Sequence, residues 1–171
     1  TKNHKKFLKL YCDALPDFRE GSAPSLSWRP PTTDHSMLCI DLDFRLSEDI
    51  LIPSLCLADL AELICKVVSN LGDMEQFGVV LTRKMRNYPK KYQGKDCWAS
   101  GMHMYFIGFL VSKPLAQKIR KACFPILEGF AAEHPIINPP EDVFDSKVSP
   151  LGKNGLLMLG DYKPTKSGGA Y

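Results

Sequence analysis

The segment at residues 38–45 constrains the fold of this chain more than any other part of its sequence. It reads Leu-Cys-Ile-Asp-Leu-Asp-Phe-Arg, an apolar run in which one leucine separates two aspartates. Successive side chains of a β-strand point to opposite faces, so Asp41 and Asp43 share one face and the apolar residues beside them share the other. The segment is therefore predicted to be a strand with one face in the core and one acidic face.

The acidic face of this strand creates a charge problem. Two carboxylates held roughly 7 Å apart on a strand cannot both be buried unpaired, because desolvation of each costs several kcal/mol. A divalent cation such as Mg²⁺ or Mn²⁺, bound through carboxylate oxygens, would solve this problem, and it makes Asp41 and Asp43 candidate metal ligands. The alternative is a strand end that runs into solvent. Arg45, on the same face, is expected to neutralise one aspartate or to bind a phosphate.

Length and composition fit one domain with one core. The 171 residues are 44% hydrophobic and 24% charged, as in ordinary globular proteins. The sequence has no apolar run of about 18 residues or more and no leader resembling a signal peptide, so no membrane association is expected. Six cysteines without a Cys-x-x-Cys pair are expected to be reduced core residues of an intracellular protein.

Hydrophobic periodicity predicts an alternation of helices and strands. Residues 54–71 and 114–133 have helical spacing, and Pro125 is expected to break or kink the second helix. Apolar runs predict further strands at 77–81, 98–111 and 156–159. This order favours an α+β domain with a mixed or antiparallel sheet flanked by helices. We expect an excised piece of a longer protein, in which an extension at 1–35, a helix and a loop, packs on a core at 36–171.

A second motif lies in the strand predicted at 98–111. It reads Ser-Gly-Met-His-Met-Tyr-Phe from residue 100, and alternation places Gly101, His103 and Tyr105 on one face with the methionines in the core. Gly101 leaves room for a ligand or another backbone to approach closely. His103 can donate a hydrogen bond to a phosphate oxygen, whereas a histidine satisfied within the protein is the competing interpretation.

Two later motifs supply a carboxylate and a lysine. Asp145 follows a short apolar stretch, and a third carboxylate beside the aspartate pair would complete a two-metal site. The competing interpretation is an aspartate in a turn or helix cap, and Asp142 is a nearby alternative. Lys163 lies just beyond the last predicted strand, where a lysine can hold a phosphate as a point charge, although an isolated lysine there is more typical of a solvated turn.

The segment at 83–95 is strongly basic and is predicted to be a loop. Its thirteen residues include six cations, no acidic residue and interleaved tyrosines. Such a segment is usually solvated, but this composition also suits phosphate contacts and base stacking with nucleic acid. The candidate nucleic-acid contacts are Arg83, Lys84, Arg86, Lys90, Lys91 and Lys95.

In chain order, the motifs Asp-x-Asp, Gly-x-His, apolar-Asp and Gly-x-x-Lys resemble those of the archaeo-eukaryotic primase superfamily. Their spacing is most similar to the primase domains of primase-helicases from poxviruses and other large DNA viruses, and the resemblance covers residues 36–165. It implies an RRM-like catalytic core. It also implies that Asp41, Asp43 and Asp145 are catalytic ligands of two Mg²⁺ or Mn²⁺ ions. By the same resemblance, the residues that contact the nucleotide are Ser100, Gly101, His103 and Lys163, with Arg45 as a further candidate.

The resemblance implies a DNA primase or primase-polymerase that makes primers by template-directed nucleotidyl transfer. Its partners would be a single-stranded DNA template, nucleoside triphosphates and a helicase domain in the same longer polypeptide. An intracellular location is expected, in the cytoplasm or nucleus of a host cell if the protein is viral. Two alternatives stay open, namely a nucleotide-sugar glycosyltransferase that uses Asp-x-Asp and a non-catalytic nucleic-acid-binding module. A rolling-circle endonuclease fits poorly, because no second histidine accompanies His103.

Overall fold

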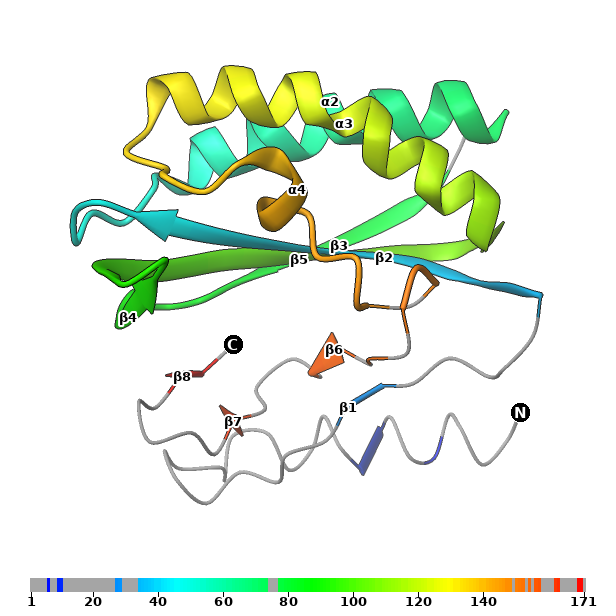
Figure 1. Ribbon diagram of the computed structural model, residues 1–171. Coiled ribbons are helices and arrows are strands. Elements are labelled where there is room, and N and C mark those ends of the chain that lie inside the picture. The colour runs from blue at the N-terminus through cyan, green and yellow to red at the C-terminus, as the bar shows by residue number, and fades with distance from the viewer. Residues whose placement is uncertain are drawn as a thin grey trace.

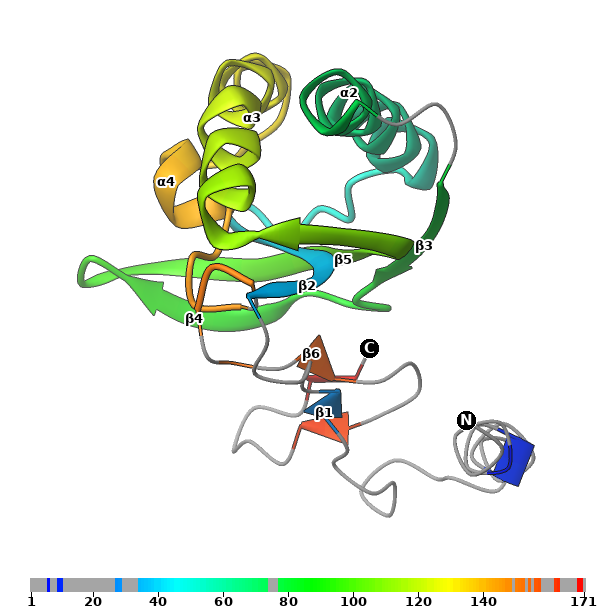
Figure 2. The ribbon, with the colours of Figure 1, turned by 90° about the vertical axis from the view of Figure 1, so that its right-hand side faces the viewer.

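Two long helices lie on one face of a four-stranded antiparallel sheet (Figures 1 and 2). The computed structural model describes residues 6, 9–10, 27–28, 34–73, 77–148, 150–152, 154, 156–157, 162–163 and 169–170. Sheet and helices form one α+β unit, as the sequence predicted. Among the described helices, none is long and apolar enough to cross a membrane.

The sheet is organised around its longest strand. This strand, β5 (Lys95–Ser112), pairs with β2 (His35–Leu46) along one edge. Along its other edge it pairs first with β4 (Tyr88–Tyr92) and then with β3 (Gly78–Arg83). Every pairing is antiparallel, so the strands predicted at 38–45, 77–81 and 98–111 are confirmed with somewhat different ends.

The helices α2 (Ser54–Gly72) and α3 (Lys113–Glu133) cover one face of the sheet (Figure 2). The core between the layers consists of fully buried side chains from both, including Ile40, Leu42 and Phe44 from β2. The apolar half of the 38–45 segment therefore faces the helices, and the two aspartates face away from them. The predicted division of this strand into a core face and an acidic face is confirmed.

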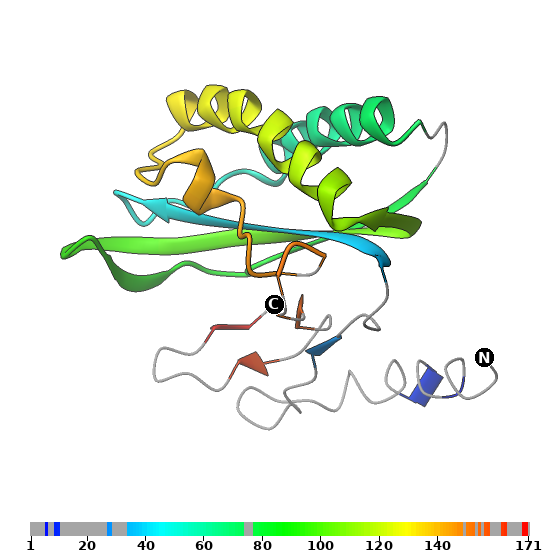
Figure 3. The same ribbon diagram turned by 45° about the vertical axis from the view of Figure 1, so that its right-hand side comes forward.

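Pro125 does not break the second helix, contrary to one of the two expectations. The helix α3 is continuous from Lys113 to Glu133, and its axis changes direction part-way along (Figure 3). It begins with the hydroxyl of Ser112 accepting a hydrogen bond from the backbone N–H of Leu115, and with a proline at its start. A proline in a long helix removes one backbone hydrogen bond, and packing against α2 and the sheet compensates for that loss.

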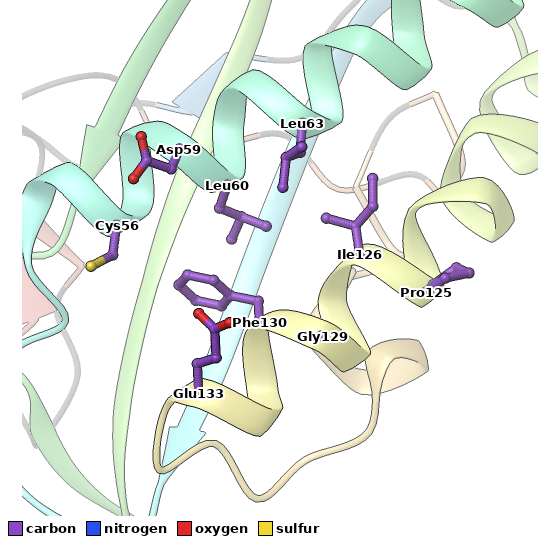
Figure 4. A pocket seen from close by; sticks show the side chains of 9 residues that line it. All are labelled: Cys56, Asp59, Leu60, Leu63, Pro125, Ile126, Gly129, Phe130 and Glu133. Carbon is purple, nitrogen blue, oxygen red and sulfur yellow. The ribbon is translucent and has the colours of Figure 1, made fainter.

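A groove separates α2 from α3 on the side of the sheet away from the aspartates. It has a volume of about 320 Å³, and Phe130 of α3 points across it toward Leu60 of α2 (Figure 4). Its rim carries Asp59 and Glu133, and its walls are mainly apolar. The groove is therefore separate from the acidic face of β2.

Residues 88–95 of the basic segment form a β-hairpin, which corrects the prediction of a loop there, whereas residues 84–87 are a loop between β3 and β4. Strand β4 and the start of β5 pair as Tyr92 with Lys95, and the two residues between them have positive φ angles, 49° at Gln93 and 80° at Gly94. Two such residues form the tight turn that suits the twist of a hairpin. Pro89 is tolerated because β4 lies at an edge.

The chain after α3 returns along the free edge of β2. The backbone N–H of Ile137 donates to the carbonyl of Arg45, and Leu42 forms an isolated bridge with Phe144. Between these contacts lies a short helix, α4 (Pro140–Val143), where the sequence predicted a proline-rich turn. This return carries the residues that follow α4 to the edge of the aspartate strand.

The remaining described strands are two-residue pairs. The pair β1 (Ser27–Trp28) and β6 (Leu156–Leu157) joins a part of the predicted extension to the strand predicted near the end of the chain. The second pair is β7 (Tyr162–Lys163) with β8 (Gly169–Ala170). The five described cysteines are free thiols and three of them are buried, as expected, whereas Cys12 lies outside the described residues.

Candidate active site

The register between β2 and β5 brings the first two motifs together. Asp41 lies directly opposite His103, and Asp43 lies directly opposite Gly101. Residues paired in this way project from the same face of a sheet. The two aspartates, the glycine and the histidine are therefore neighbours on the face that the helices leave uncovered.

Gly101 is needed for the close approach of β2. A Cβ atom at this position would lie 2.5 Å from the carbonyl oxygen of Leu42 and 3.6 Å from the Oδ1 atom of Asp43. A Cβ atom essentially never lies within 3.0 Å of a non-bonded heavy atom, so a side chain at this position would force the two strands apart. The prediction that another backbone approaches closely here is confirmed.

The third aspartate lies beside the first. The backbone N–H of Asp145 donates to the carbonyl oxygen of Asp41 at 3.0 Å, next to the bridge between Leu42 and Phe144. From α3, Arg120 holds this segment by donating to the carbonyl oxygens of Phe144 at 3.0 Å and Glu141 at 2.6 Å. The structure thus brings Asp145 to the strand that carries the other two carboxylates.

Asp142, the nearby alternative to Asp145, has a different partner. Its Oδ2 atom accepts a hydrogen bond of 2.7 Å from the hydroxyl of Tyr92, at the end of β4. This bond raises the pKa of the Tyr92 phenol. It joins the β-hairpin to α4 across the mouth of the site.

Asp43 is compensated by two cationic side chains. Its Oδ1 atom lies 3.4 Å from Nζ of Lys84, and its Oδ2 atom lies 3.6 Å from Nη2 of Arg45. Burial raises the pKa of Asp43, but Lys84, Arg45 and Lys90 outweigh burial and hold that pKa below its ordinary value. The expectation that Arg45 neutralises an aspartate is confirmed, and Lys84 supplies a second cation that the sequence did not indicate.

Asp41 has a histidine as its neighbour. Its Oδ1 atom lies 3.4 Å from Nε2 of His103, and Nδ1 of the same ring lies 3.3 Å from the hydroxyl of Tyr105. The approach to Asp41 does not have the geometry of a hydrogen bond, so Oδ1 is a buried oxygen that receives no hydrogen bond from the residues the structure describes. A buried carboxylate oxygen in this state is unfavourable unless a cation or a donor reaches it.

Asp145 has a raised pKa for two reasons that act in the same direction. Burial is the larger cause, and the negative charges of Asp41 and Asp43 add to it. The backbone N–H of Lys147, which donates to Oδ1 of Asp145 at 2.8 Å, and the charge of Lys147 oppose the shift. The three carboxylates therefore repel one another in the absence of an added cation.

A cleft of about 310 Å³ opens beside Asp43 and Asp145, and Asp41 is not part of its described lining. Asn138 supports its floor, because its side chain accepts from the backbone N–H of Arg45 at 2.8 Å and donates to the carbonyl oxygen of Asp43 at 2.9 Å. The polar lining consists of Asp43, Arg45, Lys90, Tyr92, Asn138, Glu141, Asp142, Asp145, Ser146 and Lys147. Sequence reasoning missed Asn138 and Lys147, and only their closeness to Asp145 in the chain could have indicated them.

Of the five predicted nucleotide contacts, Arg45 alone belongs to the described lining of this cleft. Gly101 and His103 lie on the same face of the sheet but outside that lining, and His103 is buried between Asp41 and Tyr105. Ser100 pairs with Phe44, so it lies on the helix-covered face and is buried there. Lys163 lies in β7 and pairs with Gly169, and its side chain is outside the described part of the chain. Its role near a triphosphate stays a prediction.

The six cations of the basic segment occupy three kinds of position. Lys84 is buried against Asp43, which differs from the exposed loop position expected for it. Arg83 donates to the carbonyl oxygen of Ile52 at 2.9 Å and to Oγ of Ser54 at 3.0 Å. These hydrogen bonds connect the end of β3 to the start of α2. The others are exposed: Arg86 lies in the connection between β3 and β4, and Lys90, Lys91 and Lys95 lie on the hairpin.

The donor set fits a divalent metal ion in its chemistry. The site offers three carboxylates, which are the hard oxygen ligands that Mg²⁺ and Mn²⁺ prefer. One has a buried oxygen that receives no donor from the described residues, and another has a pKa raised by burial and by the charges of the other two. Within the described ranges, no three His, Cys, Asp or Glu side chains already form a metal-holding group. Binding would therefore require these side chains to reorient.

An antiparallel sheet with helices on one face and this set of aspartates on the other is the arrangement expected of an archaeo-eukaryotic primase core. The whole chain, residues 1–171, matches the family described as "C962R protein N-terminal AEP domain". The chain therefore belongs to this family of archaeo-eukaryotic primase (AEP) domains, and the superfamily resemblance and α+β fold class are confirmed. No curated protein matches the sequence.

The contact at Gly101 gives a direct test of the strand register. Gly101→Ala should lower the free energy of unfolding by about 1–3 kcal/mol, because the new methyl group meets the backbone of β2. Gly129→Ala is the matched control, since a Cβ atom there meets nothing within 4 Å and alanine favours the helix. Urea unfolding measures both variants. Equal stability of Gly101→Ala and wild type would contradict the register.

The pKa of Asp43 predicts how stability depends on pH. Because the folded-state pKa lies below the ordinary value of 3.8, ionised Asp43 stabilises the fold above that pH, and this contribution is lost as the pH falls through the folded-state pKa. The stability difference between wild type and Asp43→Asn should therefore be largest near neutral pH and shrink below 3.8. Urea unfolding at a series of pH values measures it. A constant difference would show that the ion pairs with Lys84 and Arg45 do not stabilise the fold.

Proposed function

We propose that this domain is the catalytic domain of a DNA primase or primase-polymerase, which makes primers by metal-dependent, template-directed nucleotidyl transfer. The observation that carries the proposal is the meeting of three aspartates from two parts of an AEP-family chain, Asp41 and Asp43 on β2 and Asp145 after α4. Their placement beside a polar cleft with cationic residues supports the same function.

In this proposal, Asp41, Asp43 and Asp145 hold Mg²⁺ or Mn²⁺. The bound ions supply the acidity that activates a 3′-hydroxyl and the charge that stabilises the leaving pyrophosphate. The chain's own contribution is to hold the three carboxylates in place, through the β2–β5 register and the hydrogen bond from Asp145 to the backbone of Asp41. No side-chain nucleophile is required.

The cationic side of the cleft is suited to the triphosphate. Lys90, Lys147 and Arg45 line it beside the aspartates, so they can pair with phosphate oxygens. His103 lies directly opposite Asp41 on β5, with its Nε2 atom 3.4 Å from Oδ1 of that carboxylate, and is proposed as a further phosphate contact from the motif match. Lys163 is proposed as a further phosphate contact on the strength of the motif order alone.

The exposed cations of the basic segment are suited to a single-stranded DNA template. Arg86, Lys91 and Lys95 are exposed, and two tyrosines of β4 flank the basic run. Phosphates bind such cations, and aromatic rings stack with bases. A helicase domain elsewhere in the same polypeptide, and action inside a host cell if the protein is viral, complete the proposal.

The family match argues against one of the two alternative functions and leaves the other to be tested by experiment. A glycosyltransferase would not require a third aspartate beside Asp41 and Asp43, and AEP membership argues against that class. A non-catalytic nucleic-acid-binding module would need none of the carboxylates, so replacing them would leave its function intact.

Primer synthesis on single-stranded DNA with Mg²⁺ or Mn²⁺ tests the proposal. Wild type should make primers, and Asp41→Asn and Asp145→Asn should each lower the rate by at least about 100-fold, because each removes one carboxylate from the metal site. Glu62→Gln, an exposed carboxylate of α2 paired with Lys66, is the matched control and should retain the wild-type rate. Activity that survives both aspartate substitutions would contradict the proposed mechanism.

A further inference from the structure

Lys84 is a lysine in an unusual position. Its side chain is 3% exposed, and its ammonium lies 3.4 Å from Oδ1 of Asp43 and 3.4 Å from the hydroxyl of Tyr88. The same ammonium lies 5.0 Å from the centre of the Tyr88 ring. Lysine is seldom buried without a specific charge partner, so the pairing with Asp43 accounts for its position.

The sheet itself fixes this ion pair. The backbone N–H of Lys84 donates to the carbonyl oxygen of Gly101 at 3.2 Å, and Gly101 is the residue paired with Asp43. Lys84, Gly101 and Asp43 therefore form a row across three neighbouring segments of chain. Because the middle residue has no side chain, the lysine can extend over it to the carboxylate.

This ion pair competes with any metal ion for the same carboxylate. Lys84 lies at one oxygen of Asp43 and Arg45 at the other, so both oxygens already face a positive charge. A divalent cation that binds Asp43 must either lie close to the ammonium of Lys84 or displace it. Two positive charges bound to the same carboxylate repel each other strongly in a partly buried site.

We infer that Lys84 is a built-in counter-ion that holds Asp43 in place before the metal arrives and weakens the binding of a divalent cation on its own. Phosphate groups that enter with the ion can form a new ion pair with the displaced ammonium. The site therefore binds the metal ion more tightly when a nucleoside triphosphate is bound as well. Lys84 is thus a positioning residue that couples metal binding to nucleotide binding. The inference rests on the proposed function, since it concerns the metal ions of that same site.

Mn²⁺ titration in the absence of nucleotide tests this role. Lys84→Met keeps the length of the side chain and removes its charge, so it should bind Mn²⁺ about tenfold more tightly than wild type. Lys66→Met makes the same change of charge on α2, where Lys66 pairs only with Glu62 among the described residues, and should bind as wild type does. With a non-hydrolysable nucleoside triphosphate present, the advantage of Lys84→Met should disappear.

A measurement on the wild-type protein covers the case in which Lys84→Met does not fold. The nuclear magnetic resonance signal of the Lys84 ammonium should shift during titration with Mg²⁺, with the same midpoint as the binding curve, while the signal of Lys66 stays constant. Adding the triphosphate analogue should shift the Lys84 signal again as the ammonium changes partner.

Two outcomes would overturn the inference, and they differ in what they say about the proposed function. Metal binding that is lost in Asp41→Asn but equal in wild type and Lys84→Met, with an unchanged Lys84 signal, would exclude the counter-ion role and leave the proposed function standing. Absence of metal binding in wild type and Lys84→Met, even with the triphosphate analogue, would overturn both.

Discussion

The antiparallel register between β2 and β5 is the constraint on which the rest of the site depends. It sets Asp41 against His103 and Asp43 against Gly101, and it is held by a core face of Ile40, Leu42 and Phe44 that the helices cover. A slip of one residue would turn both aspartates into that core, at a cost of several kcal/mol for each. The apolar half of the strand therefore fixes the position of its acidic half.

The charges around this register are balanced only in part. Lys84 and Arg45 neutralise Asp43, whereas Asp41 has a buried oxygen with no donor among the described residues and Asp145 has a pKa raised by burial and by its neighbours. One carboxylate of the three is thus stabilised within the protein, and the other two retain unfavourable charge. In the proposed metal site, a bound cation would compensate the charge that these two carboxylates retain.

Much of the sheet could be predicted from the sequence, because the alternation in β2 and β5 follows directly from a strand with two different faces. Motif order was enough to place Asp145 with the aspartate pair, although the contact depends on a return along the edge of β2 that no local pattern encodes. The hairpin was missed because its turn residues, Gln93 and Gly94, lie among lysines typical of a loop. The burial of Lys84 was also missed, because it depends on Gly101, a residue of another strand.

The central claim is that Asp41, Asp43 and Asp145 together hold the metal ions of a polymerising site. Anomalous diffraction from crystals grown with Mn²⁺ and a non-hydrolysable nucleoside triphosphate tests it most directly. The account predicts manganese bound to these three carboxylates, with the triphosphate in the cleft that Lys90 and Lys147 line. A bound triphosphate with manganese elsewhere, or manganese that contacts none of the three aspartates, would contradict it.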